Sequence, residues 1–291
     1  MSQPKNTQVK QNEKRIMKKT LNIIGAGRVG RVFAQLFAAN DVFLVQDVLN
    51  RSAASSAEAI TFIGAGSAVS CYQDLRPAAV TMLTVPDDQI ARCCAELAQS
   101  GQIGADSVVF HCSGALSSAD LLAASSLGAA VASAHPVRSF ADAATVATHF
   151  NGTFCGIEGD PRAIALLEPA LGAIGARVIA LQAGTKTLYH AASVIACNYL
   201  VTLMDVALKA YVAAGIPEQL ARQMAEPLVS ETVSNVFRLG PAQALTGPIA
   251  RGDLAAVARQ QQVVEAWDAS AGQLYASLAE ATKELAQRKT R

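Results

Sequence analysis

The sequence has little charge and few aromatic side chains. Of its 291 residues, 16% are charged and 5% are aromatic, and the formal net charge is +1. A chain with so little net charge has no overall field that would draw it to nucleic acid or anionic lipid. It is also not a disordered chain, because 51% of its residues are hydrophobic. We therefore expect a folded protein whose partners are a small-molecule substrate and a second copy of itself, with no nucleic acid and no membrane.

Signals for secretion are also missing. The six cysteines form no C-x-x-C pair, and no apolar stretch follows the basic start of the chain. Such cysteines are typical of reduced thiols, and such a start does not fit a signal peptide. The most apolar run, residues 191–204, is shorter than the roughly 20 residues of a membrane span. We expect a cytoplasmic protein in which residues 1–18 form a disordered tail.

Short β-rich runs alternate with alanine-rich helical stretches as far as Leu181. This alternation is typical of βαβ units and of a parallel sheet covered on both faces. The predicted strands are Leu21–Ile24, Gln46–Leu49, Val69–Tyr72, Val80–Thr84, Ser107–Phe110, Val131–Ala134, Thr153–Ile157 and Arg177–Ala180. The predicted fold is α/β, with a Rossmann-type doubly wound sheet over residues 19–182 and an all-α domain over residues 183–291.

The first helix of the second domain is expected to run from about Thr185 to Ala214, where Gly215 and Pro217 stop it. Its middle, AASVIACNYLVTLM, is apolar almost all round, and a helix without a polar face must be enclosed on every side. The rest of the domain is too small to surround so long a helix. The pattern therefore predicts a homodimer through the C-terminal helices. Further helices are expected over Pro217–Leu239, after a capping Asp253, and over Ser270–Gln287.

A G-x-G-x-x-G motif directly follows the first predicted strand, in LNIIGAGRVG. Gly25 would make the tight turn, Gly27 would let the backbone approach a pyrophosphate, and Gly30 would let the next helix pack on the strand. The first N–H groups of that helix would face the phosphates. The motif predicts a bound dinucleotide, held by Gly25, Ala26, Gly27, Arg28, Val29 and Gly30.

Two registers of the second strand predict different dinucleotides. If the strand covers residues 42–46, Asp47 follows it and would bind a ribose 2′-OH, which selects NAD. If it covers residues 46–49, a guanidinium and a hydroxyl follow and would hold a 2′-phosphate. The second register is favoured, because these residues lead straight into a polar turn, and it predicts NADP with NAD as the alternative. The residues of that turn are Asn50, Arg51 and Ser52.

In combination the motifs resemble one bacterial family. They are GAGRVG with NRS after it, VPDDQI, HCSGALSS, HPVRSF, YHAASVIACNYL and LTGPIARGD. The sequence is similar to Rossmann-like proteins with a C-terminal domain of unknown function, DUF2520, which are themselves similar to pyrroline-5-carboxylate reductases and, more distantly, to β-hydroxyacid dehydrogenases. The resemblance covers nearly the whole chain beyond the tail. It implies an NADP-type cofactor, a C-terminal domain like that of 6-phosphogluconate dehydrogenase and a helical dimer, but no substrate.

Candidate chemistry gathers after strands four to six, at the sheet edge where ligands bind. Val85 and Pro86 would turn the chain over the cofactor, and Ser113 and Gly114 would leave room for a nicotinamide ring. His135 is a candidate proton donor, although it could equally satisfy backbone groups in a turn. No metal is predicted, because the adjacent pair of residues 111 and 112 has no second ligand pair at a suitable spacing.

The second domain supplies further candidates. Lys186 and His190 are four residues apart and share one face of a helix on which Asn198 also lies. Either side chain could donate a proton to a heteroatom that gains charge when a C=O or C=N bond is reduced, or Lys186 could simply be solvated. β-Hydroxyacid dehydrogenases place a lysine at the comparable helix start with an asparagine four residues on, and His190 departs from that pattern. A substrate carboxylate could bind the loop of Thr246, Gly247 and Arg251, which could also merely connect and cap helices. In the similar pyrroline-5-carboxylate reductases, a loop in this region lines the substrate site at the dimer interface.

The leading hypothesis is an NADP(H)-dependent oxidoreductase that reduces a C=N or C=O bond in a small, carboxylated metabolite, as pyrroline-5-carboxylate reductases do. Catalysis is assigned to Lys186, His190 and His135. One alternative is a β-hydroxyacid dehydrogenase in which Lys186 assists acid–base chemistry. The other is a dinucleotide-binding dimer without catalysis, since no acid–base constellation is unmistakable.

Overall fold

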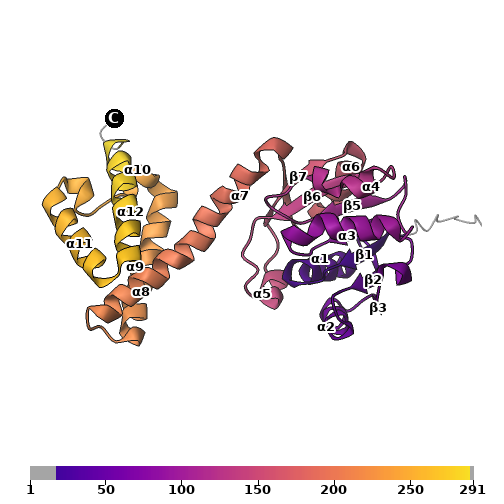
Figure 1. Ribbon diagram of the computed structural model, residues 1–291, viewed down its shortest axis with the longest axis horizontal. Helices are drawn as coiled ribbons and strands as arrows, with labels where there is room; N and C mark the ends of the chain where they lie inside the picture. Colours follow the sequence, from indigo (N-terminus) through magenta and orange to yellow (C-terminus); the bar gives the residue numbers. More distant parts are fainter. Residues whose placement is uncertain (1–17, 289–291) are drawn as a thin grey trace, which may run out of the picture. The chain divides into compact units, whose positions relative to one another are not determined.

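The computed structural model describes residues 18–288. The chain divides into two compact units, one up to Val194 and one from Ile195 onward, and each is described by itself (Figure 1). The division falls inside a helical stretch, beyond the boundary predicted at residue 182, because the first helix after the sheet belongs to the N-terminal unit. Of the predicted tail, all but Lys18 lies outside the described residues.

The N-terminal unit is built on one eight-stranded sheet with the strand order β3-β2-β1-β4-β5-β6-β7-β8. Its strands are β1 (Thr20–Ile24), β2 (Leu44–Leu49), β3 (Ser67–Val69), β4 (Val80–Leu83), β5 (Val108–His111), β6 (Ala130–Pro136), β7 (Phe154–Gly159) and β8 (Arg177–Ala180). Its helices are α1 (Arg28–Ala39), α2 (Ala53–Ile63), α3 (Asp87–Gln99), α4 (Leu122–Ser125), α5 (Ala143–Thr148), α6 (Pro161–Ala173) and α7 (Lys186–Val194). Short 3₁₀ turns lie between them at η1 (Tyr72–Asp74), η2 (Ser118–Leu121) and η3 (Ala183–Thr185).

Helices cover both faces of this sheet (Figure 1). Strands β4 and β5 are buried along their whole length, as expected for strands enclosed on two sides. One core cluster joins the sheet to α1, α2, α5 and α6, with Phe33 and Phe150 packed edge to face. The other joins it to α3 and α4. The predicted doubly wound fold is confirmed.

Two details of the predicted sheet are wrong. Strand β7 runs antiparallel to β6, with Pro136 paired with Cys155. The segment that contains α5 connects the end of β6 to the adjacent start of β7, so the chain reverses direction there. Strand β3 ends at Val69, where the sequence predicts a strand to begin, and Tyr72 opens the 3₁₀ turn η1.

The described part of the C-terminal unit is helical. It contains the π-helical turn η4 (Ile195–Tyr199), the 3₁₀ turn η5 (Ile249–Arg251) and the helices α8 (Leu200–Ala213), α9 (Glu218–Leu239), α10 (Pro241–Ala244), α11 (Leu254–Trp267) and α12 (Ala269–Arg288). As predicted, Gly215 follows the end of α8 with a positive φ of 90°, and the Asp253 side chain caps α11 by accepting a hydrogen bond from the N–H of Ala256.

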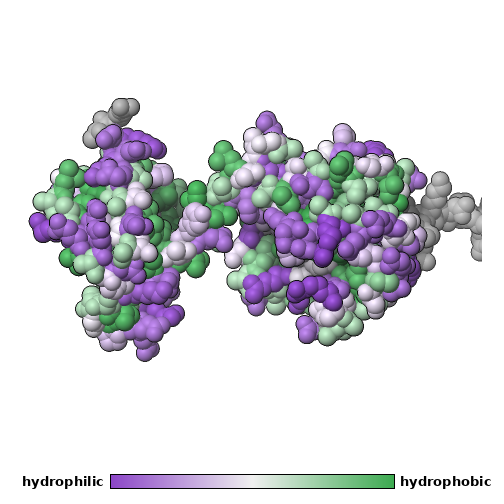
Figure 2. Space-filling model, viewed as in Figure 1, coloured by the Kyte–Doolittle hydropathy of each residue, from purple (hydrophilic) through white to green (hydrophobic). Residues whose placement is uncertain are grey.

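The apolar middle of the stretch from α7 to α8 is uncovered in the single chain. The side chains of Leu188, Ile195 and Val201 are 76%, 61% and 67% exposed. Hydrophobic residues also lie on the visible surface of the C-terminal unit (Figure 2). The stretch Ala183–Ala213 is long and apolar enough to cross a membrane by length and composition, and an 18-residue window within it has a mean hydropathy of 1.7. The core helix of a soluble protein can have the same composition.

Candidate functional site

The glycine motif forms a tight turn between β1 and α1. Gly25 has a φ of 84°, and a Cβ there would lie 2.9 Å from the backbone nitrogen of Val85. A Cβ on Gly30 would collide with Oγ1 of Thr84, so that only glycine lets α1 pack this closely on β4. At Gly27 nothing lies nearer than the Gly25 carbonyl oxygen at 3.9 Å, which leaves the space above it open. Each glycine thus has the geometry that its predicted task requires.

The turn presents free backbone donors. The first bond of the helical ladder runs from the N–H of Arg31 to the carbonyl of Gly27, so the N–H groups of residues 28–30 precede the ladder. No side chain caps this end of α1. Backbone N–H groups at a helix start, together with the positive end of the helix dipole, favour a bound phosphate.

Asn50 and Ser52 have structural tasks in place of the predicted phosphate contact. Oδ1 of Asn50 accepts a hydrogen bond from the N–H of Ala26 at 2.7 Å, and its Nδ2 donates to the carbonyl of Ser55 at 2.8 Å. Ser52 caps α2 by accepting a hydrogen bond from the N–H of Ser55. Asn50 therefore ties the glycine turn to the turn after β2. The residue of the predicted trio that stays available is the exposed Arg51.

A cavity of about 620 Å³ opens beside the glycine turn. Three guanidinium-bearing residues line it, namely Arg31, Arg51 and Arg92. The predicted contacts Val85 and Pro86 also line it, together with Gly25, Ala26, Gly27, Asn50, Ser55, Thr84, Asp88, Gln89 and Cys93. Sequence reasoning missed Arg31, although it lies one helical turn after Gly27. It also missed Arg92, for which the sequence holds no comparable signal. We call this space the cofactor cavity.

Asp47 does not have the position that the NAD register requires. Strand β2 runs on to Leu49, so Asp47 lies within the strand and is buried. Its carboxylate pairs with Nη2 of Arg76 at 2.6 Å and accepts the N–H of Arg76 at 2.8 Å. The Asp47 alternative is therefore wrong on geometric grounds, because a carboxylate committed to Arg76 inside the sheet is not free for a ribose.

A second, smaller cavity of about 230 Å³ also borders the glycine motif, through Val29. In the glycine motif, Gly27 lines the cofactor cavity and Val29 lines the smaller one. At the start of α3, Pro86 and Asp88 line the cofactor cavity, and Asp87 between them lines the smaller one. The two cavities therefore flank the same turn. The other residues of the second cavity are Cys112, Ser113, Gly114, His135, Pro136, Arg138, Phe140 and His190. Because of its two histidines we call it the histidine cavity.

Three side chains meet at the histidine cavity. Nδ1 of His135 lies 3.0 Å from the hydroxyl of Tyr189, and the two rings are perpendicular. The rings of His135 and His190 meet edge to face with 5.4 Å between centroids. Nδ1 of His190 is buried and has no hydrogen-bond partner among the described residues. Sequence reasoning predicted both histidines but missed Tyr189, which immediately precedes one of them.

Gly114 makes this arrangement possible. A Cβ on Gly114 would collide with Nδ1 of His190 and would lie 2.8 Å from Nε2 of His135. The absence of a side chain here lets both imidazoles approach the loop after β5. The sequence predicts this glycine as room for a nicotinamide ring, and the structure shows that it also makes room for the two histidines.

Burial sets the protonation of this cluster. It lowers the pKa of His135 to about 4, and the neighbouring His190 and Lys186 act in the same direction. Burial also raises the pKa of Tyr189 to about 12. At neutral pH His135 is therefore uncharged and Tyr189 keeps its hydroxyl proton.

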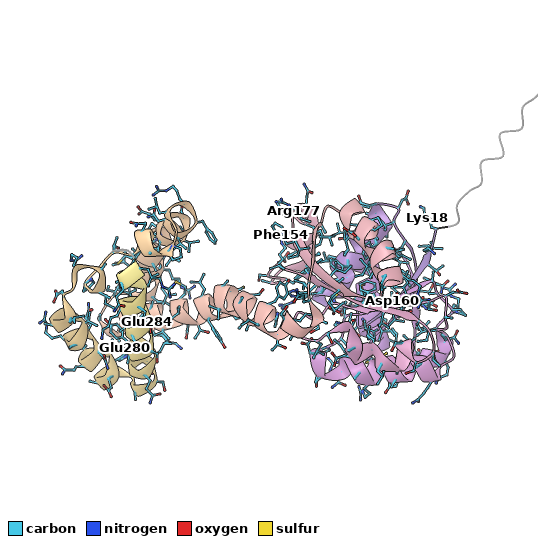
Figure 3. All side chains as sticks on the ribbon, turned by 90° about the horizontal axis from the view of Figure 1, so that it is seen from above. Lys18, Phe154, Asp160, Arg177, Glu280 and Glu284 are labelled. Atoms are coloured by element: carbon cyan, nitrogen blue, oxygen red, sulfur yellow. The ribbon has the colours of Figure 1, made fainter. Side chains whose placement is uncertain are left out.

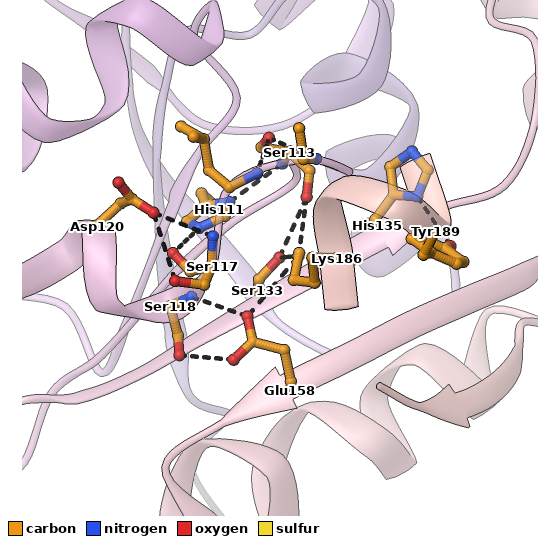
Figure 4. Close-up of polar contacts among 12 residues, drawn as sticks. His111, Ser113, Ser117, Ser118, Asp120, Ser133, His135, Glu158, Lys186 and Tyr189 are labelled. Carbon is orange, nitrogen blue, oxygen red and sulfur yellow. Dashed lines mark hydrogen bonds and ion pairs between the residues drawn. The ribbon is translucent and has the colours of Figure 1, made fainter. Parts of the chain in front are cut away.

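Lys186 lies among Ser113, Ser133 and Glu158 (Figure 4) and lines neither cavity. Its side chain is 1% exposed, and Nζ donates to the carbonyl of Ser113 at 3.1 Å and to Oγ of Ser133. Oε1 of Glu158 lies 3.7 Å from Nζ. Burial lowers the pKa of Lys186, and the charge of Glu158 opposes that shift. Lys186, the predicted proton donor, is thus a buried cation. It connects α7 to the loop after β5 and to strands β6 and β7.

The same network fixes the loop after β5. The Glu158 carboxylate accepts the N–H and the hydroxyl of Ser118, each at 2.8 Å. Nδ1 of His111 accepts the N–H of Ser113 at 3.1 Å, while its Nε2 contacts the carbonyl of Ser117 at 2.9 Å. His111 is therefore a structural residue of the loop that carries Gly114. Among residues 18–288 no group of three His, Cys, Asp or Glu side chains could hold a metal.

Two known families match most of the chain. A Rossmann-like domain matches residues 1–136, and the domain of unknown function DUF2520 matches residues 153–282. The chain is a Rossmann-like protein with a DUF2520 domain. This confirms the family resemblance read from the motifs. The match to DUF2520 begins at β7, so His135 belongs to the Rossmann-like part whereas Glu158, Lys186, Tyr189 and His190 belong to DUF2520.

Solved structures show the same fold. Protein TM1727 from Thermotoga maritima is 26% identical with a TM-score of 0.72, and the match covers 93% of this chain and 100% of that one. A candidate NADP oxidoreductase from Bacteroides fragilis has a TM-score of 0.77 at 19% identity, over 92% of this chain and 98% of that one. Pyrroline carboxylate reductase from Plasmodium falciparum with NADP bound has a TM-score of 0.57 at 12% identity, with coverages of 92% and 98%. No curated protein matches this chain in sequence.

The remaining predicted substrate contacts lie in the C-terminal unit of the DUF2520 protein. Asn198 is exposed in η4, Thr246 and Gly247 follow α10, and Arg251 is exposed at the end of η5. Their role as substrate contacts stays a prediction.

Proposed function

We propose that this protein is an NADP(H)-dependent oxidoreductase that reduces a C=N or C=O bond of a small, carboxylated metabolite. One observation carries the proposal: two cavities flank the glycine turn, one lined by arginines and the other by two histidines. An extended dinucleotide needs such a pair of spaces, one for its adenosine half and one for its nicotinamide half. When bound, the cofactor would supply a hydride at its nicotinamide ring.

The residues of the cofactor cavity fit this group. The open space above Gly27 and the N–H groups of residues 28–30 suit a pyrophosphate. Arg51 directly follows the turn residue after β2, where the adenosine ribose lies in this fold, and a guanidinium binds a phosphate through two parallel hydrogen bonds. Arg31 and Arg92 add positive charge to the same cavity. These features favour NADP, with NAD as the alternative.

The histidine cavity suits the reacting end. At about 230 Å³ it has room for little more than a nicotinamide ring and a small substrate. His135 and His190 would bind the heteroatom of the substrate and neutralise the charge that develops on it. Lys186 would position α7 and would not exchange a proton with substrate. The burial of Lys186 argues against the β-hydroxyacid dehydrogenase alternative, in which Lys186 assists acid–base chemistry. The histidine cluster argues against the other alternative, a dinucleotide-binding protein without catalysis.

A binding titration tests the cofactor assignment. NADPH and NADH are titrated into wild type, Arg51→Ala and the control Arg177→Ala. Arg177 is a suitable control because it stacks on Phe154 at the far edge of the sheet, 4.7 Å from the ring centroid (Figure 3). We expect Arg51→Ala to weaken NADPH binding about tenfold or more, and to leave NADH and the control unchanged. Equal affinity of wild type for both cofactors, unaltered by Arg51→Ala, would refute the 2′-phosphate site.

We also propose a homodimer through the C-terminal helices. The exposed apolar side chains of α7, η4 and α8 support it, because soluble monomers rarely leave large apolar patches uncovered. Val201→Glu should shift the protein from dimer to monomer in sedimentation velocity, whereas Leu122→Glu, at an equally exposed site on α4, should not. A wild-type monomer at micromolar concentration would contradict the proposal. The cytoplasmic location stays a prediction.

A further inference from the structure

We propose that Tyr189 and His135 form a proton relay that protonates a carbonyl oxygen, so that the bond this protein reduces is C=O and not C=N. The inference rests on the proposed function, because it takes the histidine cavity as the place where hydride arrives. It adds a residue, Tyr189, that sequence reasoning did not select. It also chooses between two substrate classes that the proposed function leaves open.

The relay has a defined path. The Tyr189 hydroxyl lies 3.0 Å from Nδ1 of His135, on one side of the ring. Nε2, on the other side, faces Gly114, since a Cβ there would lie 2.8 Å from it. His135 and Gly114 both line the histidine cavity. A proton can therefore pass from Tyr189 through the ring to a ligand in that cavity.

A second glycine makes room for the hydroxyl end of the relay. A Cβ on Gly156 of β7 would lie 2.9 Å from the Tyr189 hydroxyl and 2.5 Å from Cδ1 of Leu181. Gly156 is also the residue that pairs with His135 across the antiparallel strands. Two glycines, one in the loop after β5 and one on β7, thus accommodate the two ends of one hydrogen-bonded pair.

The hydrogen bond from the Tyr189 hydroxyl determines which nitrogen of His135 carries the ring proton. Among the described residues, Nδ1 of His135 is the group within hydrogen-bond distance that can accept the hydroxyl hydrogen. Tyr189 keeps that hydrogen at neutral pH, and His135 is uncharged. Nδ1 is then the acceptor, and the ring proton is on Nε2, directed toward the cavity.

The reaction balances with these groups. The carbonyl carbon would gain a hydride, with its two electrons, from NADPH, which would be oxidised to NADP⁺. The oxygen forms a bond to the Nε2 proton, Nδ1 takes the hydroxyl proton of Tyr189, and the tyrosinate regains a proton from water. Because an alkoxide is a stronger base than a tyrosinate, the proton moves downhill along this path.

A C=N bond makes a different demand. A C=N bond accepts hydride readily as the protonated iminium, which already carries a proton on nitrogen and becomes a neutral amine, so it has no use for a relay that delivers a proton to the heteroatom. His135 is uncharged, and Lys186 is turned toward Ser113, Ser133 and Glu158. Two further polar residues of the cavity have partners of their own: Asp87 accepts the hydroxyl of Ser113 at 2.8 Å, and Arg138 donates to the carbonyl of His149 and to the hydroxyl of Thr153. His190 lines the cavity beside His135 and would bind the oxygen.

The tautomer is measurable without a substrate. The chain has four histidines, so long-range ¹H–¹⁵N spectra can be assigned by single substitutions. We expect His135 of wild type to carry its proton on Nε2 and to stay neutral at pH 6. Tyr189→Phe should change its tautomer ratio, whereas the control Tyr275→Phe, which removes a hydroxyl bonded to Gln260 in the C-terminal unit, should not. A proton on Nδ1 in wild type, or the same ratio in Tyr189→Phe, would overturn the relay.

Turnover tests the substrate class. NADPH oxidation is followed with 2-oxo acids of three to six carbons and with the cyclic imine 1-pyrroline-2-carboxylate. We expect reduction of a 2-oxo acid, with kcat about 10²-fold lower in Tyr189→Phe, KM unchanged and Tyr275→Phe normal. Reduction of the imine at a rate that Tyr189→Phe leaves unchanged would overturn the proposal. NADPH affinity, measured by fluorescence for each variant, distinguishes failure of the relay from failure of the proposed function. A wild type that does not bind NADPH would contradict the proposed function itself.

Discussion

The glycine turn and the histidine cluster differ in how the chain builds them. The turn is made by one short segment, residues 25–30, and its geometry follows from three glycines next to a buried strand. The cluster joins Gly114, His135, Tyr189 and His190, which lie far apart in the sequence. A local motif can thus be found from its spacing, whereas an assembled site also depends on packing. The predictions below test this difference between the two sites.

The largest effect is expected from Gly114→Ala. The added methyl group would push both imidazoles out of place, because it collides with one and lies 2.8 Å from the nearest atom of the other. We expect kcat to fall at least about 10²-fold, the usual cost of a small displacement of catalytic groups, and NADPH affinity to fall less, because the adenosine half would bind in the other cavity. Gly172→Ala on α6, where a Cβ meets nothing within 4 Å, is the matched control. Equal loss of NADPH binding would show that the two sites are not separable.

Lys186→Met should come next, through stability. It would leave the Glu158 carboxylate buried without its cation, which typically costs about 3–5 kcal/mol of the free energy of unfolding. Lys186→Met with Glu158→Gln removes both charges and should recover part of that loss. Urea denaturation of the single and double variants measures the coupling. An unchanged stability of Lys186→Met would contradict the positioning role of Lys186.

A smaller effect is expected from acid. The pKa of His135 lies at about 4 in the folded chain, below its ordinary value of 6.5, so the unfolded chain binds the proton first as pH falls. His135 should therefore cost stability as pH drops from about 6.5 to about 4, by at most about 1.4 kcal/mol per pH unit. His135→Gln should flatten that slope, and the exposed His149→Gln should not. An identical slope in His135→Gln would contradict the buried, neutral state.

The smallest effect is expected on cofactor preference from Asp47→Asn. The variant should lose part of the ion pair with Arg76 and about 1–3 kcal/mol of stability. The ratio of NADPH to NADH affinity should stay the same, because the Asp47 carboxylate is buried and paired with Arg76. A change in this ratio of tenfold or more, measured by titration, would restore Asp47 as a cofactor contact.

The sequence predicts the fold and the glycine turn well, because both are local. Seven of the eight predicted strands overlap the observed ones closely, and the end of the long helix at Gly215 follows from one glycine and one proline. The antiparallel β7 could not be predicted, since nothing in its residues fixes its direction. The register of β2 was open until the ion pair of Asp47 with Arg76 settled it.

The histidine cluster was predictable only in part. His135 and His190 could be selected as residue types suited to proton transfer, but their contact depends on Gly114 and on how α7 packs. Lys186 was the expected proton donor because it begins a helix, and a sequence does not show that Ser133 and Glu158 enclose its ammonium group. Tyr189 and Glu158 carry no spacing signal of their own. Such residues can be recognised only once the helix and the strand that carry them are placed in the fold.

One titration tests the central claim, that a dinucleotide lies against the glycine turn. Gly27→Val adds a side chain where the chain itself leaves open space, since the nearest atom to a Cβ is 3.9 Å away and φ is not positive. We expect the melting temperature to change little and the dissociation constant for NADPH to rise at least about 100-fold, because the side chain would occupy the place of the pyrophosphate. Undiminished NADPH affinity in a folded Gly27→Val variant would contradict the account.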